Sequence, residues 1–193
     1  EELDDRVVST LDLATTGTLL LQHDYARRAG SDPGETSWTG SGGFASSLED
    51  GVTVNLGKLD DQGRGQQLVW GQDGFFVGTG LASTLTFGSE QSVGAVTFTN
   101  SVDLNGELGR VAVYNTGNSE NLLESKAFLT GAWSNGGLLF GDAESDYDGV
   151  LHAVNQNELT ALFATGGVLT TYNSASETSV SATHGELFDD AAS

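Results

Sequence analysis

One acidic run has residue types and spacing that suit a metal loop. Just before Gly149, four carboxylates alternate with other residues: Asp142, Glu144, Asp146 and Asp148. Carboxylate oxygens are the ligands that Ca²⁺ prefers, and a glycine permits the sharp turn that makes them converge. The distal glutamate of an EF-hand is missing, because the frame that begins at Glu144 ends at Asn155. We expect no cofactor. A solvated acidic loop is the favoured interpretation of this run, and a calcium site is the alternative.

The three histidines, His23, His152 and His184, lie far apart in the sequence. None has a second histidine at the spacing of a metal pair, so we expect each at the surface or at a strand end. The chain lacks a G-x-S-x-G elbow that opens a helix. Paired carboxylates serve glycosidases, but with 27 acidic residues some pair will always be close, so their abundance carries no signal. The sequence predicts a protein that is not an enzyme.

The three tryptophans, Trp38, Trp70 and Trp133, allow two interpretations. Exposed on one face, they would form a platform on which sugar rings stack. Each stands next to glycine or within an apolar block, which favours inward packing in a core.

Composition narrows the functional class. The formal net charge of −20 is unfavourable for contact with nucleic acid or with anionic lipid, so we expect neither as a partner. The chain has no Cys, which excludes disulfides and thiolate chemistry. It also has no Met and begins at Glu1, so we expect a processed, exported piece of a longer precursor. No apolar stretch is long enough to span a membrane as a helix.

Short β-rich blocks separated by Gly, Asn and Asp run through the whole chain. The predicted strands are Val7 to Leu13, Thr18 to His23, Val52 to Leu56, Gln67 to Trp70, Phe75 to Val77, Thr84 to Phe87, Ala95 to Thr99, Val102 to Leu104, Arg110 to Tyr114, Ala127 to Thr130, Leu138 to Phe140, Val150 to Val154, Leu159 to Phe163, Val168 to Tyr172 and Ser179 to Ala182. The segments Gly30 to Gly43 and Gly141 to Gly149 are predicted to be excursions from this framework.

Strands of four or five residues joined by very short glycine corners are typical of a β-solenoid with irregular rungs of roughly 20 to 30 residues. An antiparallel β-sandwich is the alternative, since Asn105-Gly106 and Asp73-Gly74 could form hairpin turns. We expect one solenoid domain over residues 1–193, with acidic tails at about 1–6 and 185–193.

Glycine-rich and aromatic blocks follow one another in a recognisable order between Thr36 and Gly141. They are Trp38–Phe44, Val52–Gly57, Leu68–Gly71, Gly74–Phe76, Ser83–Gly88, Gly94–Gly106, Arg110–Asn115, Phe128–Gly131 and Asn135–Leu138. In this order they resemble the passenger regions of bacterial autotransporters and related proteins with autotransporter-associated β-strand repeats. The resemblance covers just over half of the chain. It implies a right-handed, single-stranded parallel β-helix, export across the outer membrane, and a surface-display or adhesive role.

Two functions follow as expectations. The first is an extracellular or cell-surface structural protein whose solenoid ends stack head to tail with other copies. Strand-forming residues near the two ends are the candidates for that contact: Val7, Val8, Leu11, Leu13 and Val180. The second is an adhesin or glycan-binding module for host or matrix glycans, with calcium as an optional ligand.

Overall fold

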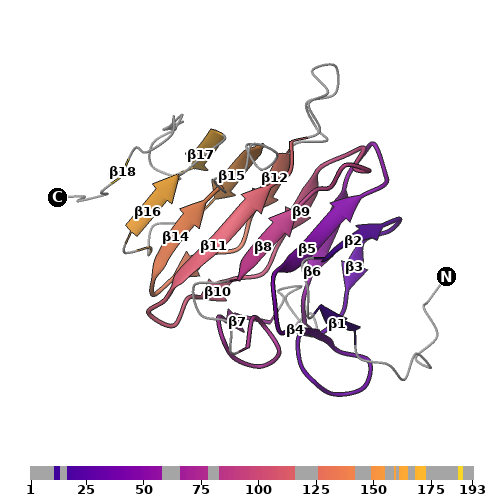
Figure 1. Cartoon of the computed structure of the whole chain (residues 1–193), viewed down its shortest axis with the longest axis horizontal. Coiled ribbons are helices and arrows are strands. Elements are labelled where there is room, and N and C mark those ends of the chain that lie inside the picture. Colours follow the sequence, from indigo (N-terminus) through magenta and orange to yellow (C-terminus); the bar gives the residue numbers. More distant parts are fainter. Residues whose placement is uncertain are drawn as a thin grey trace.

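The computed structural model describes residues 11–13, 17–57, 66–77, 83–115, 126–141, 149–154, 159, 161–164, 168–172 and 187–188. Every regular element within these ranges is a β-strand, which confirms the all-β prediction. Among the described residues no helix is long and apolar enough to cross a membrane. Figure 1 shows the strands stacked along the long axis, from β2 and β3 near one end to β16 and β17 near the other.

Most strands belong to two large sheets. The seven-stranded sheet contains, in pairing order, β2 (Gly17–Leu21), β5 (Gly42–Ser46), β8 (Thr84–Phe87), β11 (Leu108–Val113), β14 (Gly137–Phe140), β16 (Ala161–Ala164) and β18 (Leu187–Phe188). The six-stranded sheet contains β3 (Tyr25–Ala26), β6 (Val52–Asn55), β9 (Val96–Phe98), β12 (Lys126–Leu129), β15 (Val150–Val154) and β17 (Val168–Tyr172).

Two smaller sheets lie at one edge of the molecule. The three-stranded sheet contains β7 (Leu68–Val69), β10 (Val102–Asp103) and β13 (Trp133–Ser134), and β1 (Leu11–Leu13) pairs with β4 (Thr36–Trp38). Both lie along the lower edge of the view in Figure 1.

Apart from β18, the strands of each sheet pair in parallel and in the order in which they occur along the chain. The chain visits the sheets in turn, so that β10, β11 and β12 are followed by β13, β14 and β15 in the same three sheets. Among the described strands, only β16 and β18 pair antiparallel. Stacked parallel strands fit a β-solenoid. They do not fit the hairpin-based sandwich that was the alternative, because hairpins pair their strands antiparallel.

Alternation of side chains builds the core. In β9 and its flanks, Val96 and Phe98 are buried, whereas Ala95, Thr97 and Thr99 are only half-buried, as the sequence pattern predicts. Because neighbouring strands are in register, buried residues line up along the stack. One such row is Val52, Val96, Ala127, Leu151 and Leu169. The two large sheets share a single apolar core.

The predicted excursion from Gly30 to Gly43 is wrong in its second half. Thr36–Trp38 forms β4, and Gly42 begins β5, whose residues are all buried. The sequence signal is weak here because the strand starts with two glycines. These glycines are needed, since a Cβ atom on Gly43 would overlap the carbonyl oxygen of Thr86 on the neighbouring strand.

The strand predicted from Phe75 to Val77 is also wrong. The chain turns back after β7, with Phe75 N–H donating to Gln72 O at 2.8 Å, and Phe76 adopts a φ of 56°. Positive φ is unusual for a bulky residue, so tertiary packing must hold it there. Trp38 N–H donates to Gly74 O at 2.7 Å and Val77 N–H to Trp38 O at 3.0 Å. The returning segment therefore fills the place of a strand between β4 and β7.

Candidate functional surfaces

The candidate calcium ligands Asp142, Glu144, Asp146 and Asp148 lie outside the described residues. The described glycines that flank this run in the sequence are both hydrogen-bonded to β11. Gly141 N–H donates to Val111 O at 2.8 Å, and Gly149 N–H donates to Val113 O at 3.0 Å. Both ends are thus held by β11. Among the described residues no three His, Asp or Glu side chains gather as a metal site would require.

The candidate self-association residues are only partly described. Val7, Val8 and Val180 lie outside the described ranges. Leu11 and Leu13 lie in β1, where they pair in register with Thr36 and Trp38 of β4. No described strand covers the opposite edge of β1.

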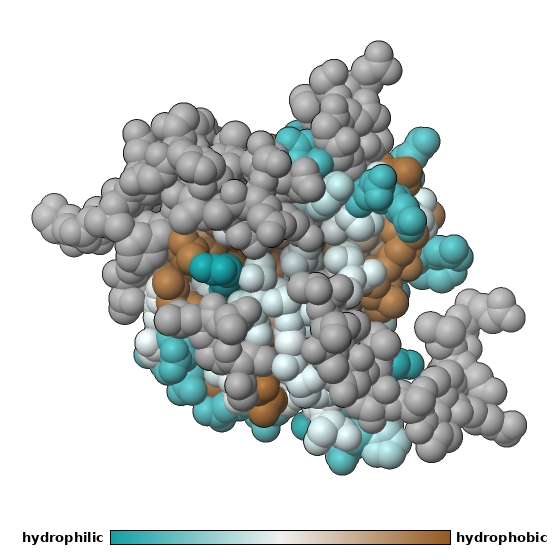
Figure 2. Space-filling model, in the orientation of Figure 1, coloured by the Kyte–Doolittle hydropathy of each residue, from teal (hydrophilic) through white to brown (hydrophobic). Residues whose placement is uncertain are grey.

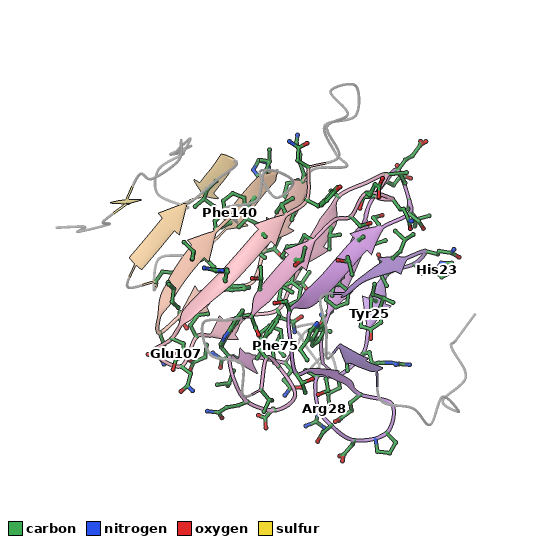
Figure 3. All side chains as sticks on the ribbon, viewed as in Figure 1. His23, Tyr25, Arg28, Phe75, Glu107 and Phe140 are labelled. Atoms are coloured by element: carbon green, nitrogen blue, oxygen red, sulfur yellow. The ribbon has the colours of Figure 1, made fainter. Side chains whose placement is uncertain are left out.

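The two described histidines differ in their surroundings. His23 is exposed in the bend after β2, at the outer end of the molecule (Figure 3). His152 lies in the middle of β15 and not at a strand end, but it is half-buried on the outer face of the sheet, which fits the surface position that was the other expectation. Its ring stacks on Phe128 of the neighbouring strand, with centroids 4.8 Å apart and an interplanar angle of 11°. Partial burial, and then the nearby Lys126 charge, lower the pKa of His152 below its ordinary value of 6.5. His184 lies outside the described residues.

The tryptophans form the core, as expected, and not a sugar platform. Trp38 and Trp133 are 0% exposed and Trp70 is 1% exposed. Phe76 stacks on Trp70 with centroids 4.4 Å apart and lies 6.0 Å from Trp38. The unusual φ of Phe76 therefore places an aromatic ring between two rungs, where it completes an internal column that includes Phe75 (Figure 3).

A buried asparagine that the sequence did not single out clamps the end of β6. Asn100 is 0% exposed, and its Oδ1 accepts from Leu56 N–H at 2.6 Å. Its Nδ2 donates to Leu56 O and, at 2.9 Å, to Gln66 O. One amide thus satisfies backbone groups on both sides of residues 58–65. The sequence signal for this role is a polar residue directly after an alternating strand. The same pattern is also typical of an exposed turn, so it did not single out Asn100.

Tyr25 closes the core at the N-terminal end. Its ring lies 5.4 Å from that of Phe44, and its hydroxyl is 2.6 Å from Thr36 Oγ1. Burial raises the pKa of Tyr25 above 10.0, which keeps the hydroxyl neutral.

The two large sheets have different outer faces. On the seven-stranded sheet, some outward residues of β5, β8 and β11 are small and nearly inaccessible, since Ala45 is 0%, Ala112 is 1% and Thr86 is 8% exposed. Larger outward residues are more accessible, and Leu20 of β2, the register partner of Ala45, is 37% exposed. Figure 2 shows a pale centre on this side of the molecule, as expected for small residues of intermediate hydropathy.

On the six-stranded sheet the outer face is open. We call this the neutral face, and it is made of half-buried or exposed side chains in three rows along the stack. The first row is Thr53, Thr97, Phe128 and His152. The second is Asn55, Thr99 and Thr130, and the third contains Lys126 and Val150. Lys126 is the charged side chain in these rows, and the exposed carboxylate of Asp24 borders the first row, where its Oδ1 accepts from Thr53 N–H at 2.7 Å.

The N-terminal end presents strand edges. β2 and β3 each pair with a described strand on one side only. Leu21 O accepts from Ser47 N–H at 2.9 Å, and Arg27 N–H donates to Asn55 O at 3.3 Å, so these groups point into the stack. Successive peptide groups of a strand alternate in direction, which turns the N–H groups of Leu20 and Ala26 toward the open edge.

The C-terminal end is less open. β18 pairs antiparallel with β16, joining Leu162 to Phe188 and Phe163 to Leu187, and thereby covers the last edge of the seven-stranded sheet. On the six-stranded sheet, β17 pairs with β15 over five residues and with no other described strand. A strand of another molecule that added to this end of the six-stranded sheet would therefore pair with β17.

Comparison of the chain with known protein families, with characterised proteins and with solved structures finds no match.

Proposed function

We propose that the chain is an extracellular or cell-surface structural protein, a right-handed single-stranded parallel β-helix that acts as a displayed passenger or as a filament subunit. The resemblance to autotransporter passengers supports export and display. This role requires no catalytic centre and no cofactor. The working surfaces of such a subunit are the ends of its stack, where copies would join head to tail.

The observation that carries this proposal is the repeated in-register addition of parallel strands. The six-stranded sheet extends from β3 to β17 by one kind of pairing, and both of its outer edges lack a partner among the described strands. A second copy whose β3 lay beside β17 would continue the sheet with the same polarity. Edges of this kind are templates for further strands, and a heterologous contact that does not close gives an open fibre.

Analytical ultracentrifugation and negative-stain microscopy over a range of protein concentrations test end-to-end assembly. We expect concentration-dependent head-to-tail oligomers, and we expect Ala26→Pro to abolish them because proline removes an N–H that points to the open edge. Glu90→Pro, at the second position of the turn closed by Ser92 N–H to Ser89 O, is the control. Dispersed monomers at every concentration, or equal assembly of both variants, would contradict the proposal.

A second candidate function is an adhesin or glycan-binding module. The hydroxyl and amide groups of the neutral face favour it, because they offer hydrogen-bonding partners on a partly solvent-accessible surface. The acidic run at 142–148 is the candidate calcium loop of such a module. A glycan array, combined with calorimetric titration of Ca²⁺, tests this function, and no bound glycan with no heat of binding would contradict it.

A further inference from the structure

The C-terminal end of the seven-stranded sheet is closed by a strand that breaks the parallel order of the stack. β18 pairs with β16 antiparallel, and the pairing joins two residues of each strand. The parallel pairs of the same sheet are longer, since β14 and β16 pair over four residues and β2 and β5 over five. Fewer paired residues form fewer backbone hydrogen bonds, so β18 is held less firmly than a strand of a further rung would be.

The sequence around β18 is typical of a protected edge. Glu186 precedes the strand, and Asp189 and Asp190 follow it. Charged side chains at an edge strand oppose the addition of a further strand. From residue 127 to the end the sequence contains no Lys or Arg, so no such cation in this part of the chain offsets these carboxylates. β18 therefore covers β16 without inviting another strand onto its own outer edge.

The opposite end of the stack carries a strand that would fit β16. β2 has five residues, pairs with β5 over all of them, and has no described strand on its other side. β2 of a second copy would run parallel to β16 and could pair with its four residues, as β14 does from the inner side. β18 and this β2 would occupy the same edge, so only one of them can be bound at a time.

The six-stranded sheet by itself offers a smaller contact between copies. β17 is open at the C-terminal end, but β3, which would add to it, has two residues and pairs with β6 over two. β2 and β3 are consecutive strands of one rung, so a full junction would form both contacts together. Most of the paired residues of that junction would join β2 to β16, which is the edge that β18 covers.

We propose that β18 is a displaceable cap, and that its release exposes the edge of β16 to β2 of a second copy. This inference rests on the proposed head-to-tail assembly and adds its regulation. The cap is tethered to the chain, so its local concentration is fixed, whereas the binding of a second copy follows mass action. The capped chain therefore assembles only at concentrations at which a second copy displaces β18.

Sedimentation velocity of the full chain over a range of concentrations tests the cap. Leu187→Pro combined with Phe188→Pro removes both N–H groups of β18. We expect this variant to assemble at a roughly tenfold lower concentration than the wild type, since the loss of one backbone hydrogen bond changes an equilibrium by about that factor. Ala191→Pro combined with Ala192→Pro is the matched control, because both prolines then lie beyond β18 in the sequence, and it should behave like the wild type.

An engineered disulfide provides a second test that does not depend on proline. Phe163 and Leu187 are register partners, and the chain has no cysteine of its own, so Phe163→Cys combined with Leu187→Cys locks β18 on β16 when oxidised. The Cα atoms of antiparallel register partners lie about 4.5–5.5 Å apart, which is within the reach of a disulfide. The oxidised protein should stay monomeric at concentrations at which the same protein assembles after reduction.

The outcomes separate the cap from the assembly itself. Equal assembly of the two proline variants, or of the oxidised and reduced disulfide variant, would overturn the cap and leave head-to-tail assembly intact. Monomers of every protein at every concentration, the proline variant of β18 included, would overturn head-to-tail assembly and the cap with it. Loss of assembly on release of β18 would show that β18 belongs to the contact between copies, and would overturn its role as a cap.

Discussion

A single amide holds together two segments of backbone that no strand pairing joins. Asn100 satisfies both backbone groups of Leu56 and the carbonyl of Gln66, and it is completely buried. At such a site the cost of a substitution comes from the groups left without a partner, and not from the size of the side chain.

Asn100→Ala should therefore lower the free energy of unfolding by roughly 2–4 kcal/mol, since buried groups without a partner cost about 1–3 kcal/mol each. Urea denaturation followed by tryptophan fluorescence measures the loss. Asn55→Ala is the control, because Asn55 is half-buried and its contact with Asn100 spans 3.5 Å. Equal losses of unfolding free energy in the two variants would show that the buried hydrogen bonds of Asn100 do not stabilise the fold in the way argued here.

His152 should make the stability of the fold depend on pH. Its folded-state pKa is lowered from 6.5, so the unfolded chain takes up the proton first as the pH falls. The contribution of neutral His152 is fully present above pH 6.5 and decreases as the pH drops below that value toward the folded-state pKa. His152→Phe keeps a ring beside Phe128 but does not titrate.

Urea midpoints between pH 7.5 and 5.5 give the measurement. The wild type should lose stability relative to His152→Phe as the pH falls, and His23→Gln, at an exposed site, should follow the wild type. If His152 titrates at or above pH 6.5 in a proton NMR experiment, this account of its environment is wrong.

At the scale of elements, the close approach of neighbouring strands decides where glycine is required. β5 begins with Gly42 and Gly43, and it lies between β8 and the edge strand β2 of the larger sheet. A Cβ atom on Gly43 would meet the backbone of Thr86, which cannot rotate away as a side chain could.

Gly43→Ala should consequently destabilise the protein by about 3 kcal/mol or more, through displacement of β8. Gly106→Ala provides the comparison. Gly106 has a φ of 78° with nothing within 4 Å of the added Cβ atom, so strain alone should cost about 1–2 kcal/mol. Thermal unfolding of the two variants tests the difference, and a smaller loss for Gly43→Ala would argue against this close packing of β5 on β8.

At the scale of the whole molecule, the fold depends on the same parallel strand pairing that the proposed end-to-end assembly would use. Each rung contacts its neighbours through parallel strands, so the stack is approximately one-dimensional and its ends are its least satisfied parts. The two ends are unequal. At the N-terminal end β2 and β3 each pair with a described strand on one side only, whereas at the C-terminal end β18 covers the edge of β16. The formal net charge of −20 opposes close association of copies at low ionic strength.

Much of this architecture could be read from the sequence. Alternating blocks such as Ala95 to Thr99 predict strands with one buried side, and β8, β15 and β17 have the predicted bounds. Tryptophans next to glycine or within an apolar block predict core positions, and all three are buried. The reason is local: side-chain alternation and tight glycine corners are properties of a few consecutive residues.

Other features depend on residues far apart in the chain. The two-residue strands β3 and β13 are too short to carry a sequence pattern, and they exist because a neighbouring rung supplies their hydrogen bonds. Phe76 adopts positive φ because Trp70 and Trp38 surround its ring. Asn100 becomes a clamp, and the neutral face becomes continuous, only when the rungs are in register. The sequence by itself determined where many strands form and which of their sides is buried. The tertiary structure decided which strands are neighbours, because the free energy of stacking comes from contacts between rungs.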